Sequence, residues 1–399
     1  MPLRILAMFF LGLSLKPSYG AEFSIDGHEF YSRYNANKIN RDAVKRGYVV
    51  RQPVYEQELR YLLATSGSFF ENLSFLLKPK LKILKTDLKY QSLVRIDEGY
   101  LTLVLADEIY IDLGRKDIRW GKAYSYSLVN GFDMANRFTT FDNEYRDSLS
   151  LQYFLGESLS LTAVLLEEGK QFALRLNHAV GEFDYDIYAF DFEDPSIGAS
   201  IAHALTSSLE LHGEVIGQWG SKRPYPIYKG RNVFLYEDLK DETSIMYGKF
   251  VIGGQYTTKS QYNFLFEYFH DETGYDNQEK VLMDAGIEES IRNEKYNDEG
   301  PFRMFFFDYH TNYDFAEFRQ NYYFVRVSKE DFFIDGLDIQ MPLFYSVDES
   351  SYVFIPDTIY QVTSHVALEG KLFLPGPGVD SEFNHFFNHY GSLGIRAKF

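Results

Sequence analysis

Apolar and polar residues alternate along most of this chain, in segments of about ten residues that are closed by short turns. Clear examples are residues 148–153, 158–163, 172–177, 209–215 and 262–268. Because successive side chains of a β-strand point to opposite faces, each segment predicts a strand with one apolar and one polar face. The breaks between them, such as Gly156-Glu157 and Gly181-Glu182, are typical of hairpin turns. The pattern therefore predicts an all-β fold of antiparallel hairpins.

The final segment, residues 393–399, alternates in the same way, with Phe399 on its apolar face and Arg396 and Lys398 on the other. In a soluble sandwich, which is the alternative, such a strand leaves a free edge. A closed transmembrane barrel needs it to pair with the first strand. A terminal aromatic residue after alternating apolar residues resembles the C-terminal signature of bacterial outer-membrane barrels, where it is the assembly signal. We therefore expect a transmembrane antiparallel up-and-down β-barrel.

Four stretches do not alternate and are predicted to be long external loops, near residues 117–144, 220–243, 271–315 and 375–387. Outer-membrane barrels have short periplasmic turns and long external loops, so an even number of strands separates any two external loops. The alternating segments between the stretches satisfy this rule and predict about 18 strands, with 16 as the alternative. Within the third stretch, the spacing of apolar residues predicts a short helix over 279–296.

The beginning of the chain points to export. Residues 1–20 contain Arg4, an apolar run over 5–15 and small residues at 18 and 20, which predicts a signal peptide cleaved near Gly20. Residues 21–399 are then expected to form a single barrel. No later run is long and apolar enough for a transmembrane helix, and the mean hydropathy is −0.28.

Composition narrows the function classes. The chain has no cysteine, which excludes disulfides and thiolate chemistry, and its 36 Phe and 32 Tyr suit the aromatic girdles of a barrel. The net charge is −17, and becomes −19 without Arg4 and Lys16 of the signal peptide. This charge disfavours nucleic acid as a partner and predicts a weak preference for cations.

The alternation also predicts which side chains face the interior. A charge that faces lipid at mid-membrane costs roughly 2–4 kcal/mol, so the polar members of each strand should point inward. The predicted channel-lining residues are Arg175, Asn177, Glu210, His212, Glu214, Lys249, Gln255, Glu267, Asp338, Glu369, Lys371 and Arg396. Their mixed charges predict a transverse field that orients polar solutes. The alternative is that they pair with each other and fill the interior.

One internal segment resembles a known group of proteins. Residues 111–122 read Ile-Asp-Leu-Gly-Arg-Lys-Asp-Ile-Arg-Trp-Gly-Lys, similar to the Gly-Arg-Gln-x-x-x-Trp-Gly-Lys element of outer-membrane channels that include the alginate-export family. Lys116 stands where Gln is usual. Residues 348–351 with Pro356, Tyr360 and Gly370 resemble a second pattern near the end of such barrels. The resemblance implies an 18-stranded barrel that passes a polar or anionic solute.

Taken by its residues alone, the same segment predicts a motif at the mouth of the pore. Arg115, Arg119 and Lys122 would attract anions there, beside Trp120 and Gly121. Alternatively, Trp120 is an anchor at the membrane interface and the cations contact lipid headgroups.

Enzyme chemistry is not expected, because no catalytic motif occurs in its structural context. Glu210, His212 and Glu214 are capable of acid–base chemistry but are interpreted as lumen lining. No cofactor is predicted, except that the acidic stretch 271–300 could hold Ca²⁺ or Mg²⁺ that bridges to lipopolysaccharide. A solvated acidic surface is the alternative.

The leading hypothesis is an outer-membrane channel for passive passage of small polar solutes or ions. Export of an acidic polysaccharide is an alternative that needs a lumen rich in stacked cations. A plugged barrel that serves as a surface enzyme or adhesion protein is another. The expected partners are outer-membrane lipid, lipopolysaccharide, the barrel assembly machinery acting on Phe399, and a small polar solute.

Overall fold

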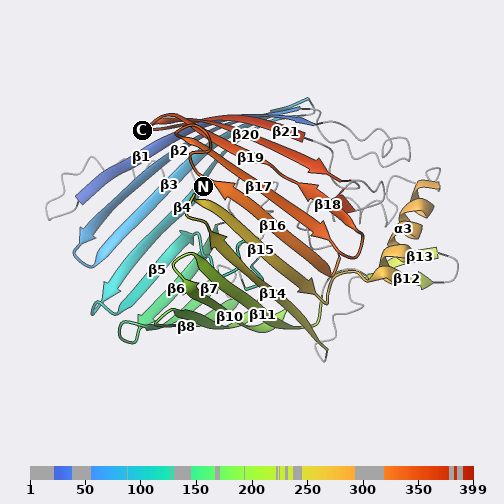
Figure 1. Ribbon diagram of the computed structural model, residues 1–399. Helices are drawn as coiled ribbons and strands as arrows, with labels where there is room; N and C mark the ends of the chain where they lie inside the picture. Colours follow the sequence, from blue (N-terminus) through green and yellow to red (C-terminus); the bar gives the residue numbers. More distant parts are fainter. Residues whose placement is uncertain are drawn as a thin grey trace.

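A computed structural model describes most of the barrel and parts of its connections. The described residues are 22–37, 55–87, 89–125, 127–129, 145–166, 171–192, 194–221, 223, 225–229, 232–236, 245–292, 319–376, 382–383 and 390–399. Figure 1 shows the strands arranged side by side around one barrel, with the C-terminus at one end and a helix at the other. The predicted signal peptide lies outside the described residues.

The barrel strands follow each other in chain order, and consecutive strands pair antiparallel. Their bounds are β1 (Glu22–Asn37), β2 (Tyr55–Phe70), β3 (Leu73–Thr86), β4 (Tyr90–Leu105), β5 (Ile109–Lys116), β6 (Arg146–Phe154), β7 (Leu159–Leu166), β8 (Phe172–Val180), β9 (Phe183–Asp191), β10 (Pro195–Thr206), β11 (Leu209–Trp219), β14 (Met246–Thr257), β15 (Tyr262–Asp271), β16 (Asn321–Lys329), β17 (Leu337–Ser346), β18 (Ser351–Phe354), β19 (Asp357–Thr363), β20 (Val366–Pro375) and β21 (Tyr390–Lys398). β1 pairs with both β2 and β21, which closes the barrel.

β18 and β19 are two halves of one strand. Each pairs with β17 on one side and with β20 on the other. The interruption falls at Ile355-Pro356, since proline has no N–H to give to a strand ladder. Counted in this way, the described residues form a closed antiparallel barrel of 18 strands, which confirms the predicted fold class and strand number.

The longest connections all lie at one end of the barrel, which also has short ones, such as those between β3 and β4 and between β17 and β18. The other end has only short connections among the described residues, including 71–72, 181–182, 207–208 and 364–365. The predicted external loop 220–243 contains a small hairpin, β12 (Tyr225–Lys229) and β13 (Asn232–Tyr236). Its five-residue strands are too short to show the ten-residue alternation of the barrel strands.

The helix α3 (Asn277–Arg292) lies in the loop after β15 and confirms a helix within the expected range 279–296, of which residues 293–296 lie outside the described residues. Asp276 caps it, because its Oδ1 accepts hydrogen bonds from the amides of Gln278 and Glu279, both at 2.8 Å. Glu279 returns a side-chain contact by accepting the amide of Asp276 at 2.9 Å, which completes a capping box. No helix among the described residues has the length and apolar character needed to cross a membrane.

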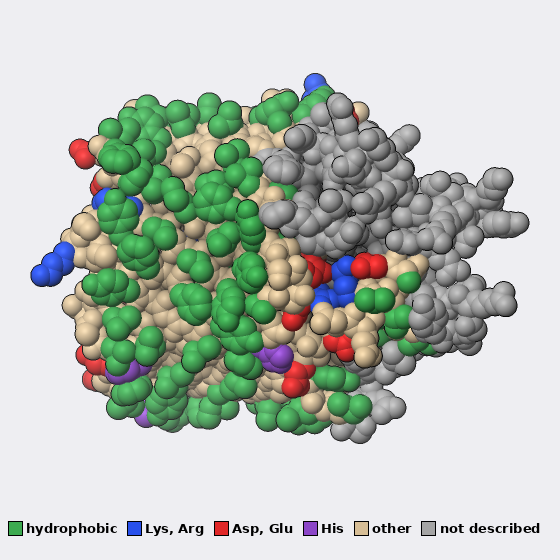
Figure 2. Space-filling model, turned by 45° about the vertical axis from the view of Figure 1, so that its right-hand side comes forward, with side chains coloured by type: hydrophobic (Ala, Val, Ile, Leu, Met, Phe, Trp, Pro, Cys, Tyr) green, Lys and Arg blue, Asp and Glu red, His purple; other side chains and the backbone are tan. Residues whose placement is uncertain are grey.

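The two faces of the barrel wall differ in character. The outer face carries exposed large apolar side chains on nearly every strand, such as Leu174, Leu211 and Ile252. Figure 2 shows these apolar side chains spread over the strand-covered surface. The cross-strand register places their polar neighbours on the opposite, inner face, as the alternation predicts.

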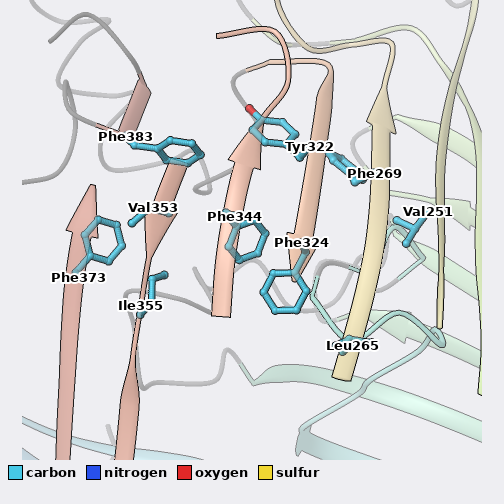
Figure 3. Packing of buried hydrophobic residues seen from close by; sticks show 10 residues of the cluster. All are labelled: Val251, Leu265, Phe269, Tyr322, Phe324, Phe344, Val353, Ile355, Phe373 and Phe383. Atoms are coloured by element: carbon cyan, nitrogen blue, oxygen red, sulfur yellow. The ribbon is translucent and has the colours of Figure 1, made fainter. Parts of the chain in front are cut away.

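Two apolar clusters lie on the inner face, which is unusual for a wall expected to be polar. The larger apolar cluster extends from β14 to β20 and consists of Val251, Leu265, Phe269, Tyr322, Phe324, Phe344, Val353, Ile355, Phe373 and Phe383 (Figure 3). The smaller apolar cluster consists of Trp120, Val129, Val164, Leu166, Ala173, Tyr188, Phe190 and Ile216. Residues that follow β5 contact both clusters, so this segment defines the interior.

Candidate functional site: an inward-folded segment opposite a charged wall

The segment 117–129, of which residue 126 is not described, leaves β5 and packs against the inner wall. Trp120, 6% exposed, lies with its ring centroid 5.8 Å from those of Tyr188 and Phe190. Leu128 packs against both apolar clusters. These contacts remove apolar surface from water on both sides of the segment, which holds it inside the barrel.

Two buried carboxylates on the wall bind the backbone of this segment. Glu214 on β11 accepts the amides of Ala123 at 2.7 Å and Leu128 at 2.8 Å, together with the Lys122 amide and the Ser127 hydroxyl. Because the segment forms no helix or strand, its amides need such acceptors. Hydrogen bonds to a charged acceptor are stronger than neutral ones, so Glu214 fixes the path of the segment.

Glu267 on β15 has the same role toward the middle of the segment. It accepts the amides of Tyr124 at 2.7 Å and Ser125 at 2.8 Å. His212 Nε2 lies 2.8 Å from Glu267 Oε1, and the Tyr124 ring packs edge-on against the His212 ring at 5.2 Å. The predicted lining residues His212, Glu214 and Glu267 are therefore brought together, as supports for the segment.

Lys122 reaches a second group of predicted residues on β8 and β9. Its ammonium contacts Asp184 and lies 3.2 Å from Asp186, which is also bound by Arg175 at 2.7 Å. Asn177 donates to both carboxylates at 2.8 Å. The motif residues Trp120, Gly121 and Lys122 thus lie against the inner wall. Their predicted role at the pore mouth stays a prediction.

At the water-exposed side of the segment, Tyr124 is 42% exposed and its hydroxyl meets two predicted lining residues. The hydroxyl lies 3.1 Å from Glu210 Oε1 and 2.7 Å from Gln255 Nε2. A phenol, a carboxylate and an amide are thereby presented to the interior at one place. These groups can donate to and accept from a passing polar solute.

Sequence reasoning missed a second group of residues, on β1 to β4, which we call the charged wall. It consists of Arg33, Glu58, Arg60, Lys80, Lys82, Arg95 and Asp97. Glu58 binds Arg33 at 2.7 Å and Lys82 at 3.1 Å and also contacts Arg60. Asp97 binds Arg95 at 2.6 Å and Lys80 at 3.1 Å. The alternating lysines 78, 80 and 82 were a signal that could have revealed it.

The charged wall and the inward-folded segment lie on opposite sides of the barrel. In the ring of 18 strands, β11 is nine strands away from β2, so Glu214 is placed across the barrel from Glu58. The charged wall keeps part of its surface in water, with the Arg95 side chain 32% exposed and that of Lys82 23% exposed.

The remaining predicted residues are dispersed. Arg396 binds Glu369 at 2.5 Å beside the charged wall, and Lys371 is in register with Asp357. Lys249 binds Asp271 at 3.1 Å near the external end. Asp338 accepts the amide of Asp331 in the turn between β16 and β17, Arg115 binds Asp147, and Arg119 binds Asp117.

Comparison with known proteins rests on structure. No family model matches the chain, and no curated protein matches it. The solved structure of Acinetobacter baumannii OccAB1 has a TM-score of 0.60 and 9% identity, over 95% of this chain and 96% of that one. The chain has a porin-like fold. The structure of Pseudomonas aeruginosa OpdL has a TM-score of 0.57 and 11% sequence identity, over 95% of this chain and 98% of that one. The structure of P. aeruginosa OccK11 has a TM-score of 0.56 and 10% sequence identity, over 95% of each chain.

These porin-like neighbours are outer-membrane channels, which agrees with the coarser level of the resemblance inferred from residues 111–122. These structures do not support the more specific part of that resemblance, the relation to the alginate-export family. Within the described residues, no group of three or more His, Asp or Glu side chains is arranged to hold a metal ion.

Proposed function

We propose that this chain is a channel of the bacterial outer membrane through which small polar solutes diffuse. The observation that carries the proposal is the asymmetric interior. The segment 117–129 is anchored on one side by Glu214 and Glu267, whereas the charged wall opposite keeps water-exposed side chains. A narrowed path between a fixed segment and a charged wall suits a small hydrated solute.

The charge distribution supports diffusion over the two alternatives. The cations of the charged wall are paired with Glu58 and Asp97, so they do not form the uninterrupted cationic lining that export of an acidic polysaccharide needs. The polar groups near Tyr124 are bound to one another, with no activated nucleophile among them. The porin-like neighbours are likewise channels and not enzymes.

The proposal includes the expected route to the membrane. The predicted signal peptide of residues 1–20 would direct export, and the Phe399 strand would be read by the barrel assembly machinery. The exposed apolar outer face would contact outer-membrane lipid, and the external loops lipopolysaccharide.

Single-channel recording in planar bilayers tests this function. The refolded full-length protein should give discrete conductance steps that are linear in voltage at low potentials. A protein that folds into a barrel but gives no steps would overturn the channel proposal and favour a plugged barrel.

Replacement of Glu214 by Gln tests the role of the anchored segment. Glu214 binds the Ala123 and Leu128 amides with different oxygens, so Gln can accept only one of them and its NH2 group faces the other. Loss of a charged acceptor costs about 2–3 kcal/mol. We expect larger and noisier conductance steps, because the segment detaches from the wall. Glu157→Gln, in an exposed periplasmic turn, is the matched control. Identical recordings from both variants would contradict the constricting role of the segment.

A further inference from the structure

Polar side chains from four neighbouring strands lie in a row on the inner face, next to Tyr124. The register places Glu210 on β11 opposite Gln255 on β14, and Arg326 on β16 two strands farther along the same row. Asn263 on β15 occupies the next inward position beside this row. The row crosses three strand spacings, which is about 14 Å. We call this group the polar strip, and it consists of Glu210, Gln255, Asn263 and Arg326.

Hydrogen bonds link the members of the polar strip from one end to the other. The Tyr124 hydroxyl lies 3.1 Å from Glu210 Oε1 and 2.7 Å from Gln255 Nε2. Gln255 Nε2 is also 3.4 Å from Glu210 Oε2, and Asn263 Nδ2 is 3.5 Å from Gln255 Oε1. Arg326 donates to Asn263 Oδ1 at 3.5 Å. Contacts of 3.4–3.5 Å are long for N–H···O bonds, so these groups can exchange them for shorter bonds to a solute.

Arg326 keeps most of its hydrogen-bonding capacity. A guanidinium has five N–H donors, and the one hydrogen bond of this side chain among the described residues is the long one to Asn263. Glu267 attracts it through space without a direct bond, because its carboxylate is bound to the segment and to His212. Arg326 is partly exposed on the inner face. Its remaining donors are therefore available to a solute.

The two ends of the polar strip carry opposite charges. Glu210, whose side chain is 30% exposed, stands at one end and Arg326 at the other, with the two neutral amides between them. A solute with a net charge would be attracted at one end and repelled at the other. A neutral solute that carries many donors and acceptors can bind along the whole length.

Tyr124 adds an aromatic surface in a fixed position. Its amide is bound to Glu267 at 2.7 Å and its ring lies 5.2 Å from the His212 ring, yet the residue stays 42% exposed. An aromatic ring can pack on the apolar C–H face of a sugar ring, whereas amide and guanidinium groups bind sugar hydroxyls. The inner face offers both kinds of contact at this place.

We propose that the polar strip and Tyr124 form a binding site for a small neutral saccharide, such as a disaccharide. Sugar hydroxyls donate and accept, which matches a row that runs from a carboxylate through two amides to a guanidinium. The site adjoins the larger apolar cluster, in which Leu265 is in register with Arg326 (Figure 3). The inference rests on the proposed channel function and names the class of solute that the channel selects.

Calorimetric titration with maltose tests the site in the refolded full-length protein in detergent, where conduction is not needed. We expect saturable binding of maltose, and no binding of a polyethylene glycol of the same size, which offers few donors. Arg326→Met keeps an apolar stem but removes every donor, and should weaken maltose binding about tenfold. Lys259→Met removes a cation from the exposed turn 258–261 and is the matched control, with the affinity of the wild-type protein.

Tyr124→Leu keeps the test decisive if Arg326→Met does not fold. It removes the aromatic surface and the hydroxyl, and should also weaken maltose binding about tenfold. Unchanged affinity in this variant, or equal affinities in Arg326→Met and Lys259→Met, would overturn the saccharide site. Absence of maltose binding by the wild-type protein, or tighter binding of the zwitterionic amino acid glycine, would do the same.

Single-channel recording separates this inference from the proposed function. A protein that gives conductance steps but binds no maltose would refute the saccharide site and leave the channel in place. A folded protein that binds maltose without giving steps would refute the channel and leave the binding site in place.

Discussion

Single residues determine the path of the segment 117–129 along the inner face of the barrel. Gly121 has φ +104°, a conformation that L side chains rarely adopt. A Cβ there would overlap the Ser127 hydroxyl and lie 2.5 Å from Glu214 Oε1. Trp120 packs on one side of this point and Glu214 lies on the other, so the Trp-Gly pair has a steric basis.

Replacement of Gly121 by alanine should therefore alter the channel. Gly156 is a matched control, because it has φ +81° but nothing within 4 Å of its would-be Cβ. Both variants bear the cost of a strained backbone, about 1–3 kcal/mol, in urea unfolding. Only Gly121→Ala should also change single-channel conductance. If Gly156→Ala changes it equally, the close approach to Glu214 is not what matters.

Residue roles were only partly predictable. Alternation places Glu214 and Glu267 on the inner face, as the structure does. It cannot show that they bind amides of the segment 122–128, because those partners lie about 90 and 140 residues earlier in the chain. Contacts at such separation are set by closure of the barrel and leave no local pattern.

At the scale of elements, alternation predicted the barrel strands and missed features that are short or irregular. The hairpin β12–β13 is too short, and the break between β18 and β19 depends on Pro356, which was visible in the sequence. The start of α3 was also readable, since Asp276 followed three residues later by Glu279 is a capping pattern.

Phe399 extends the seam between β1 and β21 beyond their paired residues, which run from Glu29–Lys398 to Asn37–Tyr390. The Phe399 amide donates to the His28 carbonyl at 2.9 Å and its carbonyl accepts the His28 amide at 3.0 Å. Their rings stack with centroids 5.1 Å apart. Deletion of Phe399 should destabilise the folded barrel by about 2 kcal/mol, through two hydrogen bonds and the ring contact.

Urea unfolding in lipid vesicles measures this loss, and Phe399→Tyr should keep the wild-type midpoint because it retains both backbone bonds and the ring. A deletion variant with the wild-type midpoint would show that the seam does not need this residue.

At the scale of the whole molecule, charge is distributed unevenly. The net charge of the chain predicts a weak cation preference, yet the charged wall contains five cations and two acids, with Glu56 as a third acid 3.3 Å from Arg33. This local excess favours anions near the wall. Composition could not reveal the difference, because a net charge says nothing about which residues face the interior.

Lys82→Gln tests the influence of the wall. Glu58 keeps Arg33 and Arg60 as partners, so the variant should fold. Loss of one inner cation should shift the reversal potential in a KCl gradient toward cation selectivity by a few millivolts. Lys85→Gln, on the opposite face of the same strand, should leave it unchanged. The same shift in both variants would rule out a specific effect of the wall.

The sequence separation between the inward-folded segment and its two anchors, Glu214 and Glu267, also predicts the order of folding steps. The amides of residues 122–128 have no acceptors on the wall until β11 and β15 have joined the sheet. Contacts of such high sequence separation form late, because the chain loses conformational entropy before they stabilise it. The pairing of β1 with β21 joins residues that are still farther apart in sequence, so by the same rule the interior is narrowed before the barrel closes.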